Sequence, residues 1–224
     1  MNTRNIIFWI KDWLQGGQIR KFYNDLKRSF EDEEYDNSKQ LKYLLDYAIL
    51  NIEFYKNLKG ETRLDSFPVV NKAIIKQNYT KFQSPLYKIK KLHVESTSGS
   101  TGTPFKIYQN QEKRKRAAAD MIFFSKFAGY EIGTKLYYCR VWNNLNRKSK
   151  ISSVLQNIIM KDSSKLSDEE MMRFIKILEK DKSKKSILIF ASTLTSLYKF
   201  VFKNELKSNT KINQSKKCRP VYGN

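Results

Sequence analysis

Apolar residues recur at helical spacing in the first third of the chain. Residues 38–57 place them three and four positions apart, which predicts an amphipathic helix. Residues 4–14 predict a shorter helix with Ile6, Ile10 and Trp13 on one face. Asn71 stands where an N-cap is expected and predicts a short helix over 72–79. The first 90 residues therefore read as a helical N-terminal region.

The pattern changes to alternating strands and helices after that point. Strands are expected at 92–97, 105–109, 135–141 and 187–191, with helices at 117–128, 151–160, 167–179 and 192–207. The helix at 117–128 is apolar nearly all round, which predicts that it is buried. Ser167 and Glu170 form a capping box at the start of their helix. The inward residues expected on that helix are Met171, Phe174, Ile175 and Leu178.

This order of elements predicts an α/β fold with a helical N-terminal lead-in, a glycine-rich β-hairpin loop and then βαβ layers. The fully apolar strand at 187–191 is typical of a parallel sheet covered on both faces. We expect a helical region over 1–90, an α/β nucleotide-binding portion over 91–207 and a polar, flexible tail over 208–224.

Composition supports a packed core but leaves the meaning of the charge open. Hydrophobic residues make up 40% of the 224, and the net charge is +21. Such a charge indicates a polyanionic partner, or else the lysine-rich coding of an AT-rich genome, since 33 lysines stand against 10 arginines. Residues 113–224 hold 25 basic and 9 acidic side chains, a net +16, which a missing acidic partner segment would also explain.

Several classes of site and location find no support. Cys139 and Cys218 lie far apart, with neither a disulfide framework nor metal-ligand spacing, and Cys139 fits a buried inert role. The one histidine, His93, has no catalytic partner in view and is expected to be structural. No secretory signal is evident, and the apolar run 187–202 is shorter than the roughly 20 residues that a bilayer span needs. We therefore expect a cytoplasmic protein without a membrane span or a bound metal cluster.

Residues 96–105 read STSGSTGTPF, and this segment is the most informative candidate for a binding site in the sequence. Composition alone favours a flexible linker, whereas the strands expected on both sides favour a loop held at its two ends. Glycine admits positive φ and a close approach of ligand to backbone, and successive backbone N–H groups with hydroxyls can bind a phosphate. The segment fits neither the Walker nor the dinucleotide-binding glycine pattern.

The segment resembles the Ser/Thr/Gly-rich phosphate loop of the AMP-forming adenylating enzymes, and within them the phenylacetate–CoA ligase branch that includes CapK-type capsular polysaccharide biosynthesis proteins. Pro104 is followed by Phe105 and then Lys106, which is similar to the CapK-like variant. Weaker likenesses cover 54–57, 66–78 and the Gly129–Gly133 turn. Family members are longer, so the chain resembles an N-terminal portion and lacks the segments that complete the catalytic site.

The resemblance implies a carboxylate ligase that uses ATP and Mg²⁺ to form an acyl adenylate, then transfers the acyl group to CoA or another nucleophile. Such a portion would be inactive without a separate C-terminal half. The cofactor-binding residues it implies are Thr97, Ser98, Gly99, Ser100, Thr101, Gly102, Thr103 and Pro104, with Lys106 and Arg114 as weaker candidates. The alternative function is a basic binding module for nucleic acid or an anionic polymer. No nucleic-acid-binding motif supports that alternative, so we expect no nucleic-acid partner.

Overall fold

The computed structural model describes residues 2–58, 60, 63–87, 92–96, 105–142, 146–164 and 166–206. Contacts divide the chain into two compact units, one formed by residues 1–20 and 120–224 and the other by residues 21–119. The division passes through two helices, α2 (Gln18–Glu31) and α5 (Gln111–Phe127). The units are groups of contacting residues, so the expected boundaries at residues 90 and 207 stay predictions.

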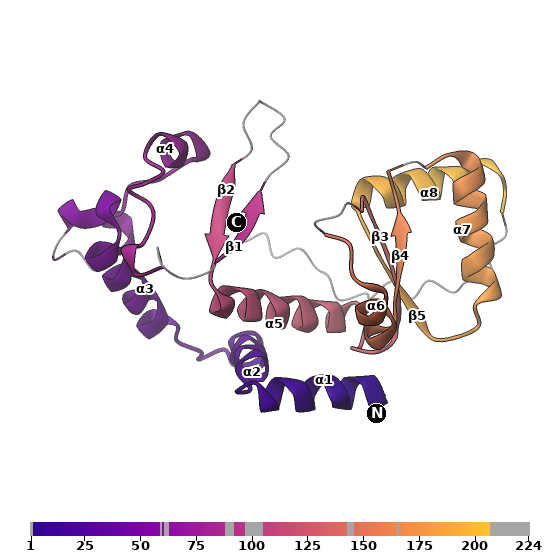
Figure 1. The fold of residues 1–224 in the computed structure, drawn as a ribbon, viewed down its shortest axis with the longest axis horizontal. Helices are drawn as coiled ribbons and strands as arrows, with labels where there is room; N and C mark the ends of the chain where they lie inside the picture. The colour runs from indigo at the N-terminus through magenta and orange to yellow at the C-terminus, as the bar shows by residue number, and fades with distance from the viewer. Residues whose placement is uncertain are drawn as a thin grey trace. The chain divides into compact units, whose positions relative to one another are not determined.

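The unit of residues 21–119 begins with helices, continues into an antiparallel hairpin and ends in the first part of α5 (Figure 1). After α2 come α3 (Ser38–Asn51), the 3₁₀ turns Glu53–Leu58 and Leu64–Ser66, α4 (Lys72–Gln77), the 3₁₀ turn Pro85–Tyr87, β1 (His93–Ser96) and β2 (Lys106–Gln109). Asn71 caps α4 as predicted, because its side chain accepts a hydrogen bond from the Ile74 amide. The helix expected over 38–57 instead ends at Asn51, and a 3₁₀ turn follows it.

Aromatic rings hold the irregular middle of this unit together. Phe54 stacks on Phe82 with 4.1 Å between ring centroids, and Tyr55 lies between Phe67 and Phe82. The backbone amide of Phe54 also donates to the Lys81 carbonyl. These contacts join the turn after α3 to the segment that follows α4.

The other unit contains a three-stranded parallel sheet. Its elements are α1 (Thr3–Leu14), the later part of α5, β3 (Lys135–Arg140), α6 (Lys150–Gln156), β4 (Ile158–Asp162), α7 (Asp168–Lys180), β5 (Lys185–Ile189) and α8 (Ala191–Lys203). The strand order is β4-β3-β5, with Tyr137 opposite Ile159 on one side and Ile187 on the other. The mixed α/β character of the prediction is confirmed.

Helices α7 and α8 cover one face of this sheet (Figure 1). Ser167 caps α7 as predicted, and its hydroxyl accepts from the Glu170 amide at 3.3 Å. All four side chains expected to face inward are buried: Met171, Phe174, Ile175 and Leu178. Phe174 and Leu178 pack against Tyr137 and Cys139 of β3, so this core joins the middle strand to the helix.

Two expectations for this part of the chain are wrong. Residues 151–160 were expected to form one helix, but α6 ends where Asn157 adopts a left-handed conformation (φ 56°), and β4 follows. Helix α5 is not buried all round, because Met121 and Phe124 are 57% and 50% exposed while Ala119 and Phe123 are buried. Among the helices that the structure describes, none has the length and hydrophobicity to cross a bilayer.

Candidate functional site

The predicted phosphate loop joins the two strands of the β1–β2 hairpin. The strands pair antiparallel from His93 opposite Gln109 to Ser96 opposite Lys106. The ends of the loop segment are therefore neighbours on adjacent strands. The eight residues implied as cofactor-binding, Thr97, Ser98, Gly99, Ser100, Thr101, Gly102, Thr103 and Pro104, lie outside the described residues.

Two lysines lie near the C-terminal end of this segment. Lys106 is the first residue of β2, directly opposite Ser96, and its side chain is exposed. The Lys72 ammonium, at the start of α4, lies 5.6 Å from the ring centroid of Phe105. Lys106 thus lies beside the end of the loop segment.

Arg114 lies near the start of α5, which follows β2 after a single residue, Asn110. Asn110 caps the helix, because its side-chain oxygen accepts from the Lys113 amide at 2.8 Å. Its side-chain amide also donates to the Tyr87 hydroxyl at 3.2 Å. Arg114 is exposed, whereas the Arg116 guanidinium lies 5.3 Å from the ring centroid of Phe22. The hydrogen bonds of Asn110 therefore fix the turn between β2 and the basic start of α5.

A second group of polar and aromatic side chains lies at the carboxyl edge of the parallel sheet. Strands β3 and β4 end side by side, with Arg140 opposite Asp162. The Ser163 amide extends this pairing by donating to the Arg140 carbonyl at 3.1 Å. Ligands of open parallel sheets bind outside the carboxyl ends of the strands. This edge is thus the place in the unit where general fold rules expect a ligand.

Arg140 is held by aromatic side chains at this edge. Its guanidinium lies 5.7 Å from the ring centroid of Tyr138 and 5.4 Å from that of Trp142, and the two rings meet edge to face. One terminal nitrogen donates to the Tyr138 hydroxyl at 3.3 Å. The Trp142 indole N–H donates to the Lys161 carbonyl at 3.0 Å, which ties the end of β3 to β4.

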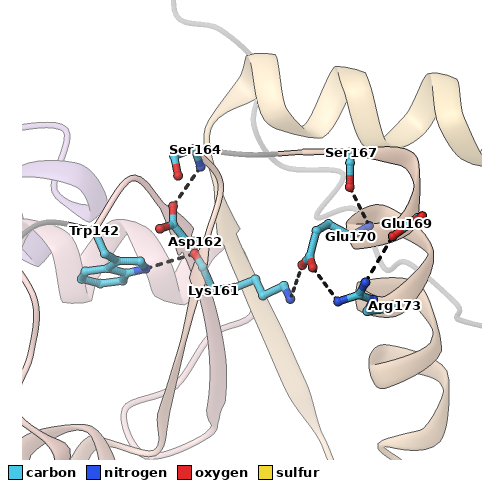
Figure 2. A network of polar contacts seen from close by, with 8 residues as sticks. All are labelled: Trp142, Lys161, Asp162, Ser164, Ser167, Glu169, Glu170 and Arg173. Atoms are coloured by element: carbon cyan, nitrogen blue, oxygen red, sulfur yellow. Dashed lines mark hydrogen bonds and ion pairs between the residues drawn. The ribbon is translucent and has the colours of Figure 1, made fainter.

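Figure 2 shows how β4 is fastened to the start of α7 next to this edge. The Lys161 ammonium lies 3.4 Å from a Glu170 carboxylate oxygen. The Arg173 guanidinium bridges Glu170 at 2.9 Å and Glu169 at 3.3 Å. Glu169 and Arg173 are largely exposed, so that pair stabilises little. The network orients Lys161 toward α7 and leaves Asp162 and Trp142 on the other side of the strand.

The carboxyl edge carries charges of both signs, since Arg140 stands opposite Asp162. Hydrogen bonds from the backbone and side chain of Ser164 hold the pKa of Asp162 below its usual range, with help from the positive charge of Arg147. Burial lowers the pKa of Lys148. In the described part of the chain, no group of three or more metal-ligating side chains comes together.

The histidine, the buried cysteine and the hollow at the end of α8 have the following surroundings. His93 lies in β1, where its ring nitrogen contacts Glu95 at 3.0 Å. Burial raises the pKa of Cys139 to about 11, so its thiol is unreactive near neutral pH. A hollow of about 390 Å³ at the end of α8 is lined by Tyr198, Val201, Phe202, Glu205 and Leu206. Glu205 is its one acidic or basic lining residue, and its charge would repel a phosphate.

Sequence reasoning missed Arg140 and Trp142. The available signal was their position at the end of a strand that the sequence does predict, followed by a polar segment. Strand β4 was not predicted, and its pairing with β3 places Arg140 opposite Asp162 at the carboxyl edge. No protein-family model matches the chain, and no match to a curated protein was found.

Proposed function

We propose that the chain is the nucleotide-binding portion of an AMP-forming carboxylate ligase, and that residues 97–104 bind the β- and γ-phosphates of Mg-ATP. The observation that carries this proposal is the pairing of Ser96 with Lys106, which brings the two ends of a Ser/Thr/Gly-rich segment together. A segment closed at both ends loses less entropy on binding than a free tether does.

Nearby positive charges favour the same ligand. Lys106 is exposed beside the end of the segment, and Arg114 is exposed near the start of α5. Ammonium and guanidinium groups donate charge-assisted hydrogen bonds to phosphate oxygens. These side chains would add to the backbone N–H groups and hydroxyls that the loop sequence supplies.

The reaction that this proposal names begins with attack of a carboxylate oxygen on the α-phosphorus of ATP. The bond from that phosphorus to the bridging oxygen breaks, pyrophosphate leaves, and an acyl adenylate forms. A thiol such as that of CoA, or another nucleophile, then takes the acyl group and releases AMP. Surface polysaccharide biosynthesis is the setting that the resemblance suggests.

The direct test is equilibrium binding of Mg-ATP by titration calorimetry. Wild-type chain should bind, and Gly102→Val should weaken binding at least tenfold, because valine disfavours positive φ and blocks close approach of a phosphate. Lys106→Ala should weaken binding by about tenfold, as expected for losing one charge-assisted hydrogen bond. Lys176→Ala, which removes an exposed charge from α7, is the matched control and should bind like wild type. Equal affinities for all four proteins would refute the proposal.

A further inference from the structure

We propose that α1 binds the surface of a membrane that contains anionic lipids, lying in the plane of the leaflet with its exposed apolar face among the lipid chains. This partner goes beyond the ATP-binding loop and does not rest on it, since α1 and the β1–β2 hairpin belong to different units. At 12 residues the helix is shorter than the roughly 20 that a bilayer span needs, so it would lie on the membrane and not cross it.

The first observation is that one side of α1 is packed within its own unit. A Cβ atom at Gly133, in the turn before β3, would come within 2.6 Å of the Arg4 Cβ, so the start of α1 lies directly against that turn. The Asp12 carboxylate is buried and accepts hydrogen bonds from the Ile19 and Arg20 amides at the start of α2. Arg4 and Asp12 lie eight positions apart, which places them on the same side of the helix. These contacts fix which face of α1 points away from the unit.

The second observation is that the opposite face of α1 is apolar and exposed. Its large side chains follow one another at spacings of three and four residues: Ile6, Ile7, Ile10, Trp13 and Leu14. Trp13 and Leu14 are 73% and 71% exposed. A contiguous exposed apolar face indicates an interaction surface. Isoleucine, leucine and tryptophan on one face of a helix are typical of segments that bind the membrane interface.

The third observation is that positive charge borders this apolar face on both sides. Lys11 is exposed and lies one helical turn from Leu14. On the other border, the Arg20 guanidinium lies 4.0 Å from the ring centroid of Trp9, which is one turn from Trp13. The apolar face therefore has a basic rim, as the headgroups of an anionic leaflet would require.

The charges of this segment fit an anionic bilayer better than a second copy of the chain. Residues 2–20 contain three basic side chains, Arg4, Lys11 and Arg20, and one acidic side chain, Asp12, which is buried on the packed side. Two copies joined through this face would bring their basic rims together, and like charges placed opposite one another oppose association. A leaflet instead offers hydrocarbon to the apolar side chains and negative headgroups to the rim.

The experiment measures co-sedimentation of the full chain with lipid vesicles. One set of vesicles contains phosphatidylcholine alone, and in the other about one-third of the lipid is phosphatidylglycerol. We expect saturable binding to the anionic vesicles, at least tenfold tighter than to the neutral ones, because each basic residue at the rim contributes roughly fivefold. Equal binding to the two sets, or no binding to the anionic vesicles, would overturn the proposal.

Matched variants separate insertion of this face from adsorption through the net charge of +21. Trp13→Ala should weaken binding to anionic vesicles at least tenfold, and Ile10→Asn at least threefold, because each removes apolar area from the face. Phe202→Ala removes an aromatic side chain of similar exposure from α8 and should bind like wild type. Gly102→Val should also bind vesicles like wild type, so failure here is distinct from failure of the ATP proposal. Equal binding by Trp13→Ala and Phe202→Ala would overturn the proposal.

A second measurement reports which side chain enters the leaflet. Lipids with brominated chains quench the fluorescence of a tryptophan that lies among those chains, and the sequence has three tryptophans, Trp9, Trp13 and Trp142. Trp13→Phe keeps an apolar ring, so it should still bind anionic vesicles but lose most of the quenching. Quenching that Trp13→Phe leaves unchanged would overturn the proposal. Self-association in sedimentation velocity that Ile10→Asn abolishes, without any vesicle binding, would assign the face to a second copy and also overturn it.

Discussion

Asp181 accepts hydrogen bonds from three side chains in the sheet-containing unit. Its carboxylate accepts hydrogen bonds from Ser183 at 2.6 Å, from the Lys135 ammonium at 2.9 Å and from the Tyr137 hydroxyl at 2.8 Å. These bonds, with the Ser183 hydroxyl first among them, hold the pKa of Asp181 well below its ordinary value. Burial and the bond to Asp181 raise the pKa of Tyr137 to about 12. The residue thus joins the end of α7 to the start of β3.

We expect Asp181→Asn to lower the free energy of unfolding by about 1–3 kcal/mol at pH 7, the range for losing a charged hydrogen-bond partner. Because the folded pKa lies below the unfolded value of about 3.9, this stability is present above pH 4 and is lost as pH falls further. Urea unfolding from pH 2.5 to 7 measures it. Asp65→Asn, at an exposed Arg63 pair, is the control and should change little. If Asp181→Asn lowered the free energy of unfolding as much at pH 2.5 as at pH 7, the expectation would be contradicted.

Tyr137 gives the opposite sign at high pH. Its folded pKa of about 12 lies above the ordinary value of 10.0, so the neutral phenol stabilises the fold below pH 10. That stability should decline as pH rises from 10 toward 12. Tyr137→Phe should flatten this decline while lowering stability at pH 7, and urea unfolding between pH 8 and 11.5 measures both effects. An unchanged alkaline decline in Tyr137→Phe would contradict the assignment.

At the scale of elements, α7 shows what sequence can predict. Its cap at Ser167 and its four buried residues depend on local spacing, and all are confirmed. Strand β4 depends instead on Asn157, whose left-handed conformation ends α6, and on pairing with β3. Neither can be deduced from apolar spacing alone, because Ile158–Met160 continues the helical pattern of residues 151–156. The arrangement at the carboxyl edge was missed for the same reason.

The cap of α7 allows a quantitative test. Ser167→Ala should lower the free energy of unfolding by about 1 kcal/mol, since the Glu170 amide loses its acceptor. Ser196→Ala is the matched control, because the Ser196 hydroxyl bonds a carbonyl inside α8 at an exposed position. Chemical denaturation of both variants measures the free energy of unfolding. A loss in Ser196→Ala as large as that in Ser167→Ala would argue against a stabilising cap.

At the scale of the whole molecule, the net charge of +21 leaves two functions open, ATP binding and polyanion binding. The dependence of binding affinity on salt concentration distinguishes them. A polyanion-binding module that contacts 6–10 phosphates should lose roughly 10³- to 10⁵-fold in affinity between 50 and 200 mM salt. We expect Mg-ATP binding to persist at 200 mM salt, where binding to a random duplex DNA becomes unmeasurable. Fluorescence anisotropy with labelled DNA and labelled ATP measures both. Tight DNA binding with no ATP binding would favour the alternative.

The most direct test of the central claim follows the backbone amides of the hairpin in ¹⁵N-labelled protein while Mg-ATP is added. If residues 97–104 bind the phosphates, the amide resonances of Ser96 and Lys106 should shift in a saturable manner, together with those of the residues between them. The same titration of Gly102→Val should shift them far less. ATP-dependent shifts confined to other parts of the chain, with Ser96 and Lys106 unmoved, would contradict the account.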